Sequence, residues 1–356
     1  MPDDSLLSKQ LAKQIENSGP ISVAEYMRFA NSHYYDNADP LGSAGDFITA
    51  PEISQIFGEL IGLWFADIWL RQNRPAKCHF VELGPGRGSL ANDALRAMAK
   101  FECAPPVHFV ETSGALRAKQ AQSVPQAKFH DRIDDLPGDG PLLIVANEFF
   151  DALPIRQLIA THAGWRERVI VREKDTKFMA IAGPYAMDNL IPPEFRAAPV
   201  NSIYETSPDA GGFMYELATR LQRQGGIMLI IDYGYSLPGL GSTLQSVQKH
   251  QFADPFEDPG GRDLTAHVNF LEMANMGRMR NLQISGPIGQ GSWLTALGIN
   301  QRAAALAQAA PDKAGEISAA CHRLTSDDEM GSLFKVLALR SPDWPKPEGF
   351  EPADIL

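Results

Sequence analysis

The sequence is poor in cysteine and has no long uninterrupted apolar run. Its three cysteines, Cys78, Cys103 and Cys321, are widely separated, odd in number and outside any C-x-x-C pair. This spacing argues against a disulfide framework, gives no sign of a zinc module and favours a reducing compartment. The longest apolar-looking stretch, residues 53–70, is interrupted by glycine and acidic residues and is marginal in length for a bilayer span. We expect a buried amphipathic helix there and no membrane span.

Positive charge is also scarce. Lys and Arg number 32 against 43 Asp and Glu, so the net charge is −11, which disfavours binding of nucleic-acid phosphates. The first residues, Met1 to Asp4, lack the basic and apolar segments of a signal peptide, which predicts a cytoplasmic protein. With 356 residues, 44% of them hydrophobic, the chain can form two domains of roughly 150 residues each or one elaborated domain.

Changes of hydrophobic period along the chain predict its organisation. A helical pattern gives way to alternating strands and helices, which indicates a parallel sheet with crossover helices, and then to strands alone. The expected parts are an N-terminal helical layer at 1–75, one half of an α/β core at 76–153, an antiparallel insertion at 154–207, the second half of the core at 208–340 with an irregular, lid-like loop at 235–262, and a C-terminal tail at 341–356.

Local signals place several helix starts and strands. Ser22 and Glu25 fit a capping box, and residues 49–52 fit a second one, with proline in the first turn of a long core-facing helix. After a buried strand at 226–232, two further apolar segments at 282–288 and 334–339 are expected to complete the sheet.

The strongest chemical signal is a glycine-rich turn between a buried strand and a helix. Gly84, Gly86 and Gly88 follow Glu82, which ends the strand, and Glu111 ends the next strand, 111 − 82 = 29 positions later. Glycines allow close approach of a ligand to the backbone, and a carboxylate at the second strand end is where nucleoside-binding folds hold ribose hydroxyls. The simpler interpretation is a tight connection between strand and helix.

Charge separates two cofactor classes that share this arrangement. Ser89 stands where the third glycine of a dinucleotide motif would be, and Glu82 would lie against the bound cofactor. A carboxylate repels a pyrophosphate but attracts the ammonium of a methionine-like group. The pattern therefore favours S-adenosylmethionine over NAD.

A second group of polar residues follows the strand that ends at Asn147. Glu148 comes next, followed by the aromatic pair Phe149 and Phe150. Asn147 can simply shape a turn and the aromatic rings can fill the core. A carboxylate beside the cofactor, however, suits the planar donor fork of a guanidinium, which predicts an arginine acceptor.

Five ordered motifs together resemble the MidA family, the bacterial and mitochondrial group that includes complex I assembly factor 7. They are residues 45–55, 82–88, 147–154, 232–234 and 263–267, and the resemblance runs from about Ser5 to Leu339. It implies a class I S-adenosylmethionine-dependent methyltransferase fold, with a Rossmann-like, mostly parallel sheet, an N-terminal helical layer and inserted antiparallel strands. Mitochondrial members of the family methylate an arginine in the iron-sulfur protein 2 subunit of NADH dehydrogenase. The resemblance thus implies a protein-arginine methyltransferase of complex I assembly, in its bacterial branch.

The resemblance also assigns residues. Gly84, Gly86 and Gly88 would receive the cofactor, Glu111 its ribose, and Glu148 the substrate guanidinium, with Asn147 beside it.

Asp46, in the segment before the second predicted cap, is a further candidate catalytic residue, since that loop could close over the cofactor; it could equally only lead into the cap. Asp232 to Gly234 also follow a strand and open on the same edge, although such a turn can be a plain strand exit.

Three other interpretations stay open. The chain could be an assembly chaperone that keeps S-adenosylmethionine only as a structural ligand, a small-molecule methyltransferase, or, against the charge argument, an NAD-linked oxidoreductase. Asp263 and His267 lie four residues apart, but Asp263 or Thr265 more simply caps a helix through Phe270, so no metal is expected.

Overall fold

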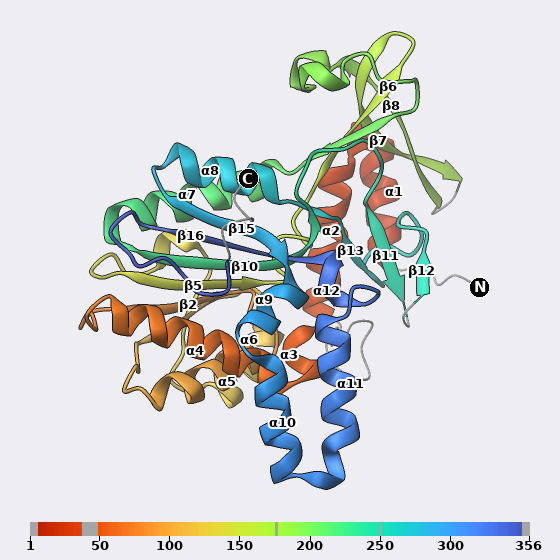
Figure 1. Cartoon of the computed structure of the whole chain (residues 1–356). Coiled ribbons are helices and arrows are strands. Elements are labelled where there is room, and N and C mark those ends of the chain that lie inside the picture. The colour runs from red at the N-terminus through yellow and green to blue at the C-terminus, as the bar shows by residue number, and fades with distance from the viewer. Residues whose placement is uncertain (1–5, 38–48, 175–176, 249–250, 351–356) are drawn as a thin grey trace. The chain divides into compact units, whose positions relative to one another are not determined.

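The structure, a computed structural model, describes residues 6–37, 49–174, 177–248 and 251–350. The chain divides into two units, each built from three separate segments (Figure 1). Unit 1 comprises residues 1–47, 151–212 and 237–269, and unit 2 comprises residues 48–150, 213–236 and 270–356. Within the described ranges, no helix is long and apolar enough to cross a membrane.

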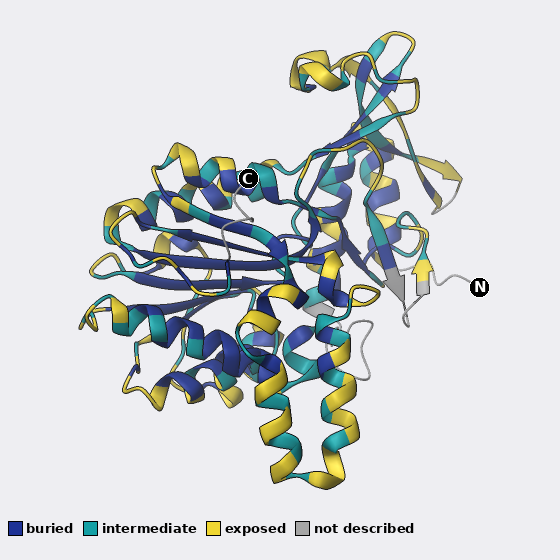
Figure 2. Ribbon diagram, viewed as in Figure 1, coloured by how far each residue is buried: buried dark blue, intermediate teal, exposed yellow. Residues whose placement is uncertain are grey.

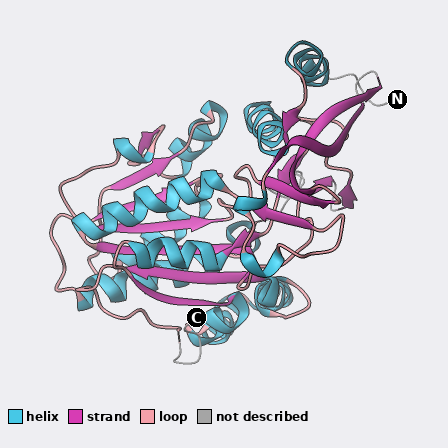
Figure 3. Ribbon diagram, turned by 90° about the horizontal axis from the view of Figure 1, so that it is seen from above, coloured by secondary structure: helices cyan, strands magenta, loops and turns pink. Residues whose placement is uncertain are grey.

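A mostly parallel sheet forms the centre of unit 2 (Figure 3). Its strand order is β15-β16-β10-β5-β2-β3-β4, in which the neighbours from β10 to β4 are parallel and β16 is antiparallel to both β10 and β15. Every residue of β2, β3 and β5 is buried, as parallel strands covered on both faces require. The strands are β2 (His79–Leu83), β3 (Val107–Val110), β4 (Lys128–His130), β5 (Leu142–Asn147), β10 (Gly226–Tyr235), β15 (Gln283–Gly289) and β16 (Phe334–Arg340). The predicted parallel sheet and its two completing strands are confirmed.

Helices cover both faces of this sheet (Figures 1 and 3). Helix α4 packs on one face in a continuous apolar core with β2, β5 and β10, and α8 packs on the other face against β15 and β16. The chain also forms a hairpin of α10 and α11, whose outer surface is exposed (Figure 2). The bounds are α4 (Gln55–Arg71), α5 (Ser89–Ala99), α6 (Gly114–Ser123), α7 (Pro208–Gln224), α8 (Phe270–Met279), α9 (Gln290–Ala296), α10 (Ile299–Ala309), α11 (Ala314–Thr325) and α12 (Met330–Leu333).

The segment before α4 differs from its prediction. Residues 50–53 form a short separate helix, α3 (Ala50–Ile53), and the side chain of Thr49 makes no capping hydrogen bond. Ser54 instead is extended and accepts a hydrogen bond from the Ile56 backbone N–H at 3.2 Å, so the long helix begins at Gln55. The prediction of a capping box at residues 49–52 was wrong, because Ser54 caps the long helix instead.

Unit 1 combines helices α1 (Leu6–Ser18) and α2 (Val23–Asn37) with an antiparallel sheet. The expected helix start at Ser22 is confirmed, since its hydroxyl accepts a hydrogen bond from the Glu25 N–H at 3.0 Å. The strand order is β1-β7-β6-β9, and β8 also pairs with β7, outside this order. The strands are β1 (Ile21–Ser22), β6 (Arg156–Thr161), β7 (Gly164–Lys174), β8 (Lys177–Ala186) and β9 (Ile203–Thr206).

A second, smaller sheet corrects the prediction of an irregular stretch at 235–262. Strand β11 (Gln245–Gln248) pairs antiparallel with both β12 (Gln251–Ala253) and β13 (Asp263–Thr265). The glycines and prolines of this stretch fall largely between these strands and so concealed them in the sequence pattern. Asp263 and Thr265 both lie in β13 and helix α8 begins only at Phe270, so the predicted cap by either residue was also wrong.

Three histidines form a hydrogen-bonded row across β2, β3 and β4. His79 Nδ1 lies 3.2 Å from His108 Nε2, His108 Nδ1 lies 2.9 Å from His130 Nε2, and His79 Nε2 lies 3.1 Å from Asp139 Oδ1. An ionised carboxylate only accepts, so His79 donates to Asp139, and this tautomer leaves its Nδ1 as an acceptor for the Nε2–H of His108. Burial, assisted by His79, His130 and Lys128, lowers the pKa of His108 to about 4, against the opposing effect of Asp139.

Acidification should destabilise the protein through His108. The pKa of His108 in the folded protein lies below the ordinary value of 6.5, so between pH 6.5 and about 4 the unfolded chain binds more protons than the folded one. The stabilisation that is present above pH 6.5 is therefore lost as the pH falls to about 4. We expect a loss of about 3 kcal/mol at pH 4, measured by urea unfolding across this range. His108→Gln should flatten the dependence, whereas His322→Gln, at an exposed position of α11, should not. Parallel pH curves for wild type and His108→Gln would contradict this assignment.

Candidate functional site

The turn after β2 runs along the edge of the sheet where the parallel strands end. Its three glycines have left-handed backbone angles, with φ of 58° at Gly84, 55° at Gly86 and 80° at Gly88, which side chains disfavour. A Cβ atom on Gly84 would lie only 2.9 Å from Cδ2 of Phe149. The Gly84 N–H donates to the Val110 carbonyl at 3.0 Å, which joins this turn to the end of β3. The sequence therefore fixes a narrow turn of bare backbone.

Glu111, directly after β3, is held by two donors. Its Oε1 accepts from the Ser113 N–H at 2.8 Å and its Oε2 from Gln120 Nε2 at 3.1 Å. Burial raises the pKa of Glu111, and these hydrogen bonds, with the positive charge of Arg117, act in the opposite direction. Gln120 was missed by the sequence analysis, because a glutamine within a helix carries no motif signal.

Glu82 is buried, with an exposed fraction of 3%. Burial raises its pKa to about 8, and a hydrogen bond from the Ala91 backbone in α5 acts in the opposite direction. Its Oε2 has no hydrogen-bond partner among the described residues. A carboxyl group with this pKa takes up a proton readily near neutral pH unless a cation lies beside it.

Glu148 has a backbone conformation that is rare outside glycine, with φ of 49°. Its Oε1 accepts from the Ala50 backbone N–H and from Asn147 Nδ2, both at 3.0 Å, and its own N–H donates to the Ile231 carbonyl at 2.9 Å. Asn147, which is buried, thus orients the carboxylate of its neighbour.

The two aromatic residues after Glu148, Phe149 and Phe150, lie in different surroundings. Phe150 is buried in the core, whereas Phe149 is half-buried and packs against the glycine turn. The ring centroid of Phe149 also lies 5.3 Å from that of Phe213 in an edge-to-face arrangement.

Asp232 holds the turn that bears Glu148. It is fully buried in β10, and its Oδ2 accepts from the N–H groups of Phe149 at 3.2 Å and Phe150 at 3.0 Å. Its Oδ1 accepts from the Tyr233 N–H at 2.9 Å. The carboxylate therefore accepts from three backbone donors, and two of these bonds hold the turn that directly follows Glu148.

Helix α3 contacts both halves of this edge. Its first residue, Ala50, donates to Glu148, and its third, Glu52, accepts a short hydrogen bond from the hydroxyl of Ser89 at the start of α5. Glu52 is thus tied to the helix that follows the glycine turn. Asp46 lies outside the described residues, so the prediction for it remains a prediction.

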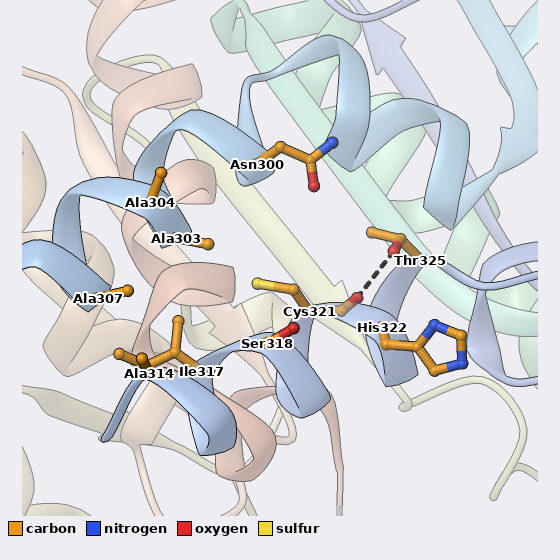
Figure 4. Close-up of a pocket in the computed structure, with 10 residues that line it drawn as sticks. All are labelled: Asn300, Ala303, Ala304, Ala307, Ala314, Ile317, Ser318, Cys321, His322 and Thr325. Atoms are coloured by element: carbon orange, nitrogen blue, oxygen red, sulfur yellow. Dashed lines mark hydrogen bonds between the residues drawn. The ribbon is translucent and has the colours of Figure 1, made fainter. Parts of the chain in front are cut away.

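Among the predicted positions, Gly84, Gly86, Gly88, Glu111 and Glu148 follow β2, β3 and β5 along one edge of the sheet, and Glu82 and Asn147 lie at the ends of β2 and β5. A separate cavity of about 410 Å³ lies between α10 and α11 (Figure 4). It is lined mainly by small side chains and by no carboxylate; among its lining residues, Thr325 donates to the Cys321 carbonyl at 2.8 Å. It offers no counter-charge for an ammonium or guanidinium group, which leaves the strand edge as the candidate site.

Comparison with known proteins decides the class of chemistry. Residues 60–288 match the sequence profile of a family described as "Putative S-adenosyl-L-methionine-dependent methyltransferase". The chain belongs to this methyltransferase family. S-adenosylmethionine is accordingly its cofactor, and the family predicted from the five sequence motifs is confirmed.

Individual relatives match over most of their length. A Drosophila melanogaster protein named protein arginine methyltransferase NDUFAF7 homolog, mitochondrial, is 36% identical over 94% of this chain and 84% of its own. The Homo sapiens protein arginine methyltransferase NDUFAF7, mitochondrial, is 33% identical over 93% and 82%. A crystal structure from Burkholderia thailandensis bound to S-adenosyl-homocysteine superposes with a TM-score of 0.87 at 26% identity, covering 98% of this chain and 95% of that one. The predicted class I methyltransferase fold is thereby confirmed.

The strand edge of this methyltransferase suits its cofactor. The three glycines leave bare backbone at this edge, where a Cβ atom on Gly84 would meet Phe149, and Glu111 and Glu148 directly follow the two neighbouring strands, β3 and β5. The unpaired, buried Oε2 of Glu82 is an acceptor that a cationic group can stabilise.

Replacing Asp232 should destabilise the methyltransferase. In Asp232→Asn the amide presents a donor to at least one of three backbone N–H groups, and a buried donor left unpaired costs about 1–3 kcal/mol. Urea unfolding should show that loss. Asp67→Asn, at an exposed ion pair with Arg71, is the control and should change stability by less than about 0.5 kcal/mol. An Asp232→Asn protein as stable as wild type would show that the carboxylate is dispensable.

Proposed function

We propose that this methyltransferase transfers a methyl group to an arginine of a protein. The observation that supports this most directly is Glu148, whose carboxylate is held at this strand edge by Ala50 and Asn147 and whose backbone is left-handed. A residue kept in an unfavourable backbone conformation by several hydrogen bonds has its side chain orientation fixed. A fixed carboxylate suits a guanidinium, which presents its N–H donors in a rigid plane.

The remaining residues hold the cofactor in this proposal. Gly84, Gly86 and Gly88 let it approach the backbone, Glu111 accepts from its ribose hydroxyls, and Glu82 lies toward its methionine ammonium. When bound, S-adenosylmethionine supplies a sulfonium methyl group. Glu148 aligns the attacking guanidinium nitrogen and takes up the proton released as the N–C bond forms and the C–S bond breaks. Asn147 keeps Glu148 in place.

The names of the curated relatives support an arginine in a protein as the acceptor. We extend the proposal to a NADH dehydrogenase iron-sulfur subunit, through the resemblance to the MidA family, and so to complex I assembly. The cytoplasmic location stays a prediction from the sequence.

Glu111→Ala should weaken cofactor binding. Loss of a hydrogen-bonded carboxylate from the ribose corresponds to roughly a 10- to 150-fold rise in Kd, measured by calorimetric titration with S-adenosylhomocysteine. Asp131→Ala is the control, because Asp131 is a neighbouring exposed carboxylate paired with Arg117. If Glu111→Ala bound as tightly as wild type, Glu111 would not contact the ribose.

Glu148→Gln should separate binding from transfer. The amide is the same size but carries no negative charge, so cofactor affinity should persist while methyl transfer falls at least about 100-fold. The assay is incubation with methyl-labelled S-adenosylmethionine and extract from cells lacking the gene, followed by gel analysis and recovery of methylarginine from the hydrolysate. A discrete labelled band with wild type, absent with Glu148→Gln, supports the proposal. Label in another amino acid or in a small molecule would refute the arginine acceptor.

A further inference from the structure

A glutamine of α6 joins two separate parts of the cofactor edge. Gln120 Nε2 lies 2.8 Å from the Gly86 carbonyl oxygen and 3.1 Å from Glu111 Oε2. The side chain is fully buried. Helix α6 itself packs closely on the glycine turn, since a Cβ atom on Gly88 would lie 3.4 Å from Cβ of Ser123 and 3.7 Å from Cα of Gln120. One amide therefore links the turn after β2 to the carboxylate after β3.

The orientation of this amide is settled by its neighbours. A carbonyl oxygen and a carboxylate both only accept, so the NH2 group must face them and uses both of its hydrogens. Its Oε1 is then left buried without a hydrogen-bond partner among the described residues. A buried acceptor without a donor destabilises a fold. Packing alone would thus favour an apolar side chain of the same size at this position.

We propose that Gln120 is a positioning residue for S-adenosylmethionine. It fixes the plane of the Glu111 carboxylate and its distance from the Gly86 backbone. The carboxylate that binds the ribose and the glycine turn that binds the rest of the cofactor are thereby kept at a constant distance from each other. The inference rests on the assignment of Glu111 and the glycine turn to the cofactor in the proposed function.

The chemistry of an amide suits this role better than that of other side chains. A lysine would place a charge beside Glu111 and compete with the ribose hydroxyls for its oxygens, and a glutamate would repel both acceptors. A neutral group with two donors leaves the second lone pairs of the carboxylate available to the cofactor.

The test separates affinity from stability. Gln120→Met fills a similar volume and removes the unpaired acceptor, but it also leaves the Gly86 carbonyl and Glu111 Oε2 without this donor, so its thermal midpoint should fall no further than that of the control variant Gln290→Met. Its Kd for S-adenosylhomocysteine, measured by calorimetry, should rise about tenfold or more, as losses of groups that orient a ligand-binding residue do. Gln120→Glu should bind more weakly still, because a second carboxylate then lies beside Glu111.

The chain offers a matched control in Gln290. This residue is also fully buried, donates from Nε2 to the Leu324 carbonyl at 2.9 Å, and has an Oε1 without a partner among the described residues. It lies at the start of α9, and its side-chain hydrogen bond goes to α11 and not to the glycine turn. Gln290→Met should alter the thermal midpoint and leave the Kd unchanged.

Each outcome decides between the roles. Weaker binding in Gln120→Met, with a fall in thermal midpoint no larger than that of Gln290→Met, supports positioning. An unchanged Kd in both Gln120 variants would overturn it and make Gln120 a packing residue. A Glu111→Ala protein that still binds S-adenosylhomocysteine as wild type does would instead refute the ribose assignment in the proposed function. Because Glu111→Ala and Gln120→Met are titrated side by side, the two failures can be told apart.

Discussion

The buried carboxylate of Asp232 is the interaction on which the acceptor side of the site depends. The turn after β5 leaves the sheet with its N–H groups pointing inward, and without an acceptor they would be buried unpaired. Asp232, on the neighbouring parallel strand, accepts from Phe149, Phe150 and its own successor. With the turn held in this way, Glu148 can keep a left-handed conformation that its side chain would otherwise resist. The fully buried Asp232 thus positions the turn, whereas the partly buried Glu148 is the carboxylate that is proposed to act on the substrate.

The cofactor side depends on a different constraint, which is the close approach of neighbouring residues to the backbone of the glycine turn. The glycine turn lies against Phe149 on one side and α6 on the other, so its path is narrow in both directions. Gln120 and Glu52 then tie its two ends to neighbouring elements, through Gly86 and through Ser89. The turn is therefore held by side chains that lie far from it in sequence.

This arrangement explains which parts the sequence could predict. Strand periodicity and the glycine spacing are local signals, and they correctly predicted the parallel sheet, the turn after β2 and the carboxylates at the strand ends. Gln120 and Ala50 act through contacts between distant segments, and neither a helical glutamine nor a backbone N–H has a recognisable pattern. Asp232 was noted at the same edge, but its contacts with Phe149 and Phe150 have no local signal. Ser54 and β11 were missed for another reason, since competing cap and turn signals nearby obscured them.

The charges of the site follow from the reaction it is proposed to perform. A sulfonium and a guanidinium are both cations, and they must come into contact in a site from which water is largely removed, where their repulsion is strong. Glu82, Glu111 and Glu148 supply three carboxylates at one strand edge, and burial raises the pKa of the first two. Burial is the main cause of both raised pKa values, so a cation beside these carboxylates offsets that penalty. The same desolvation thereby favours positively charged ligands over dinucleotides.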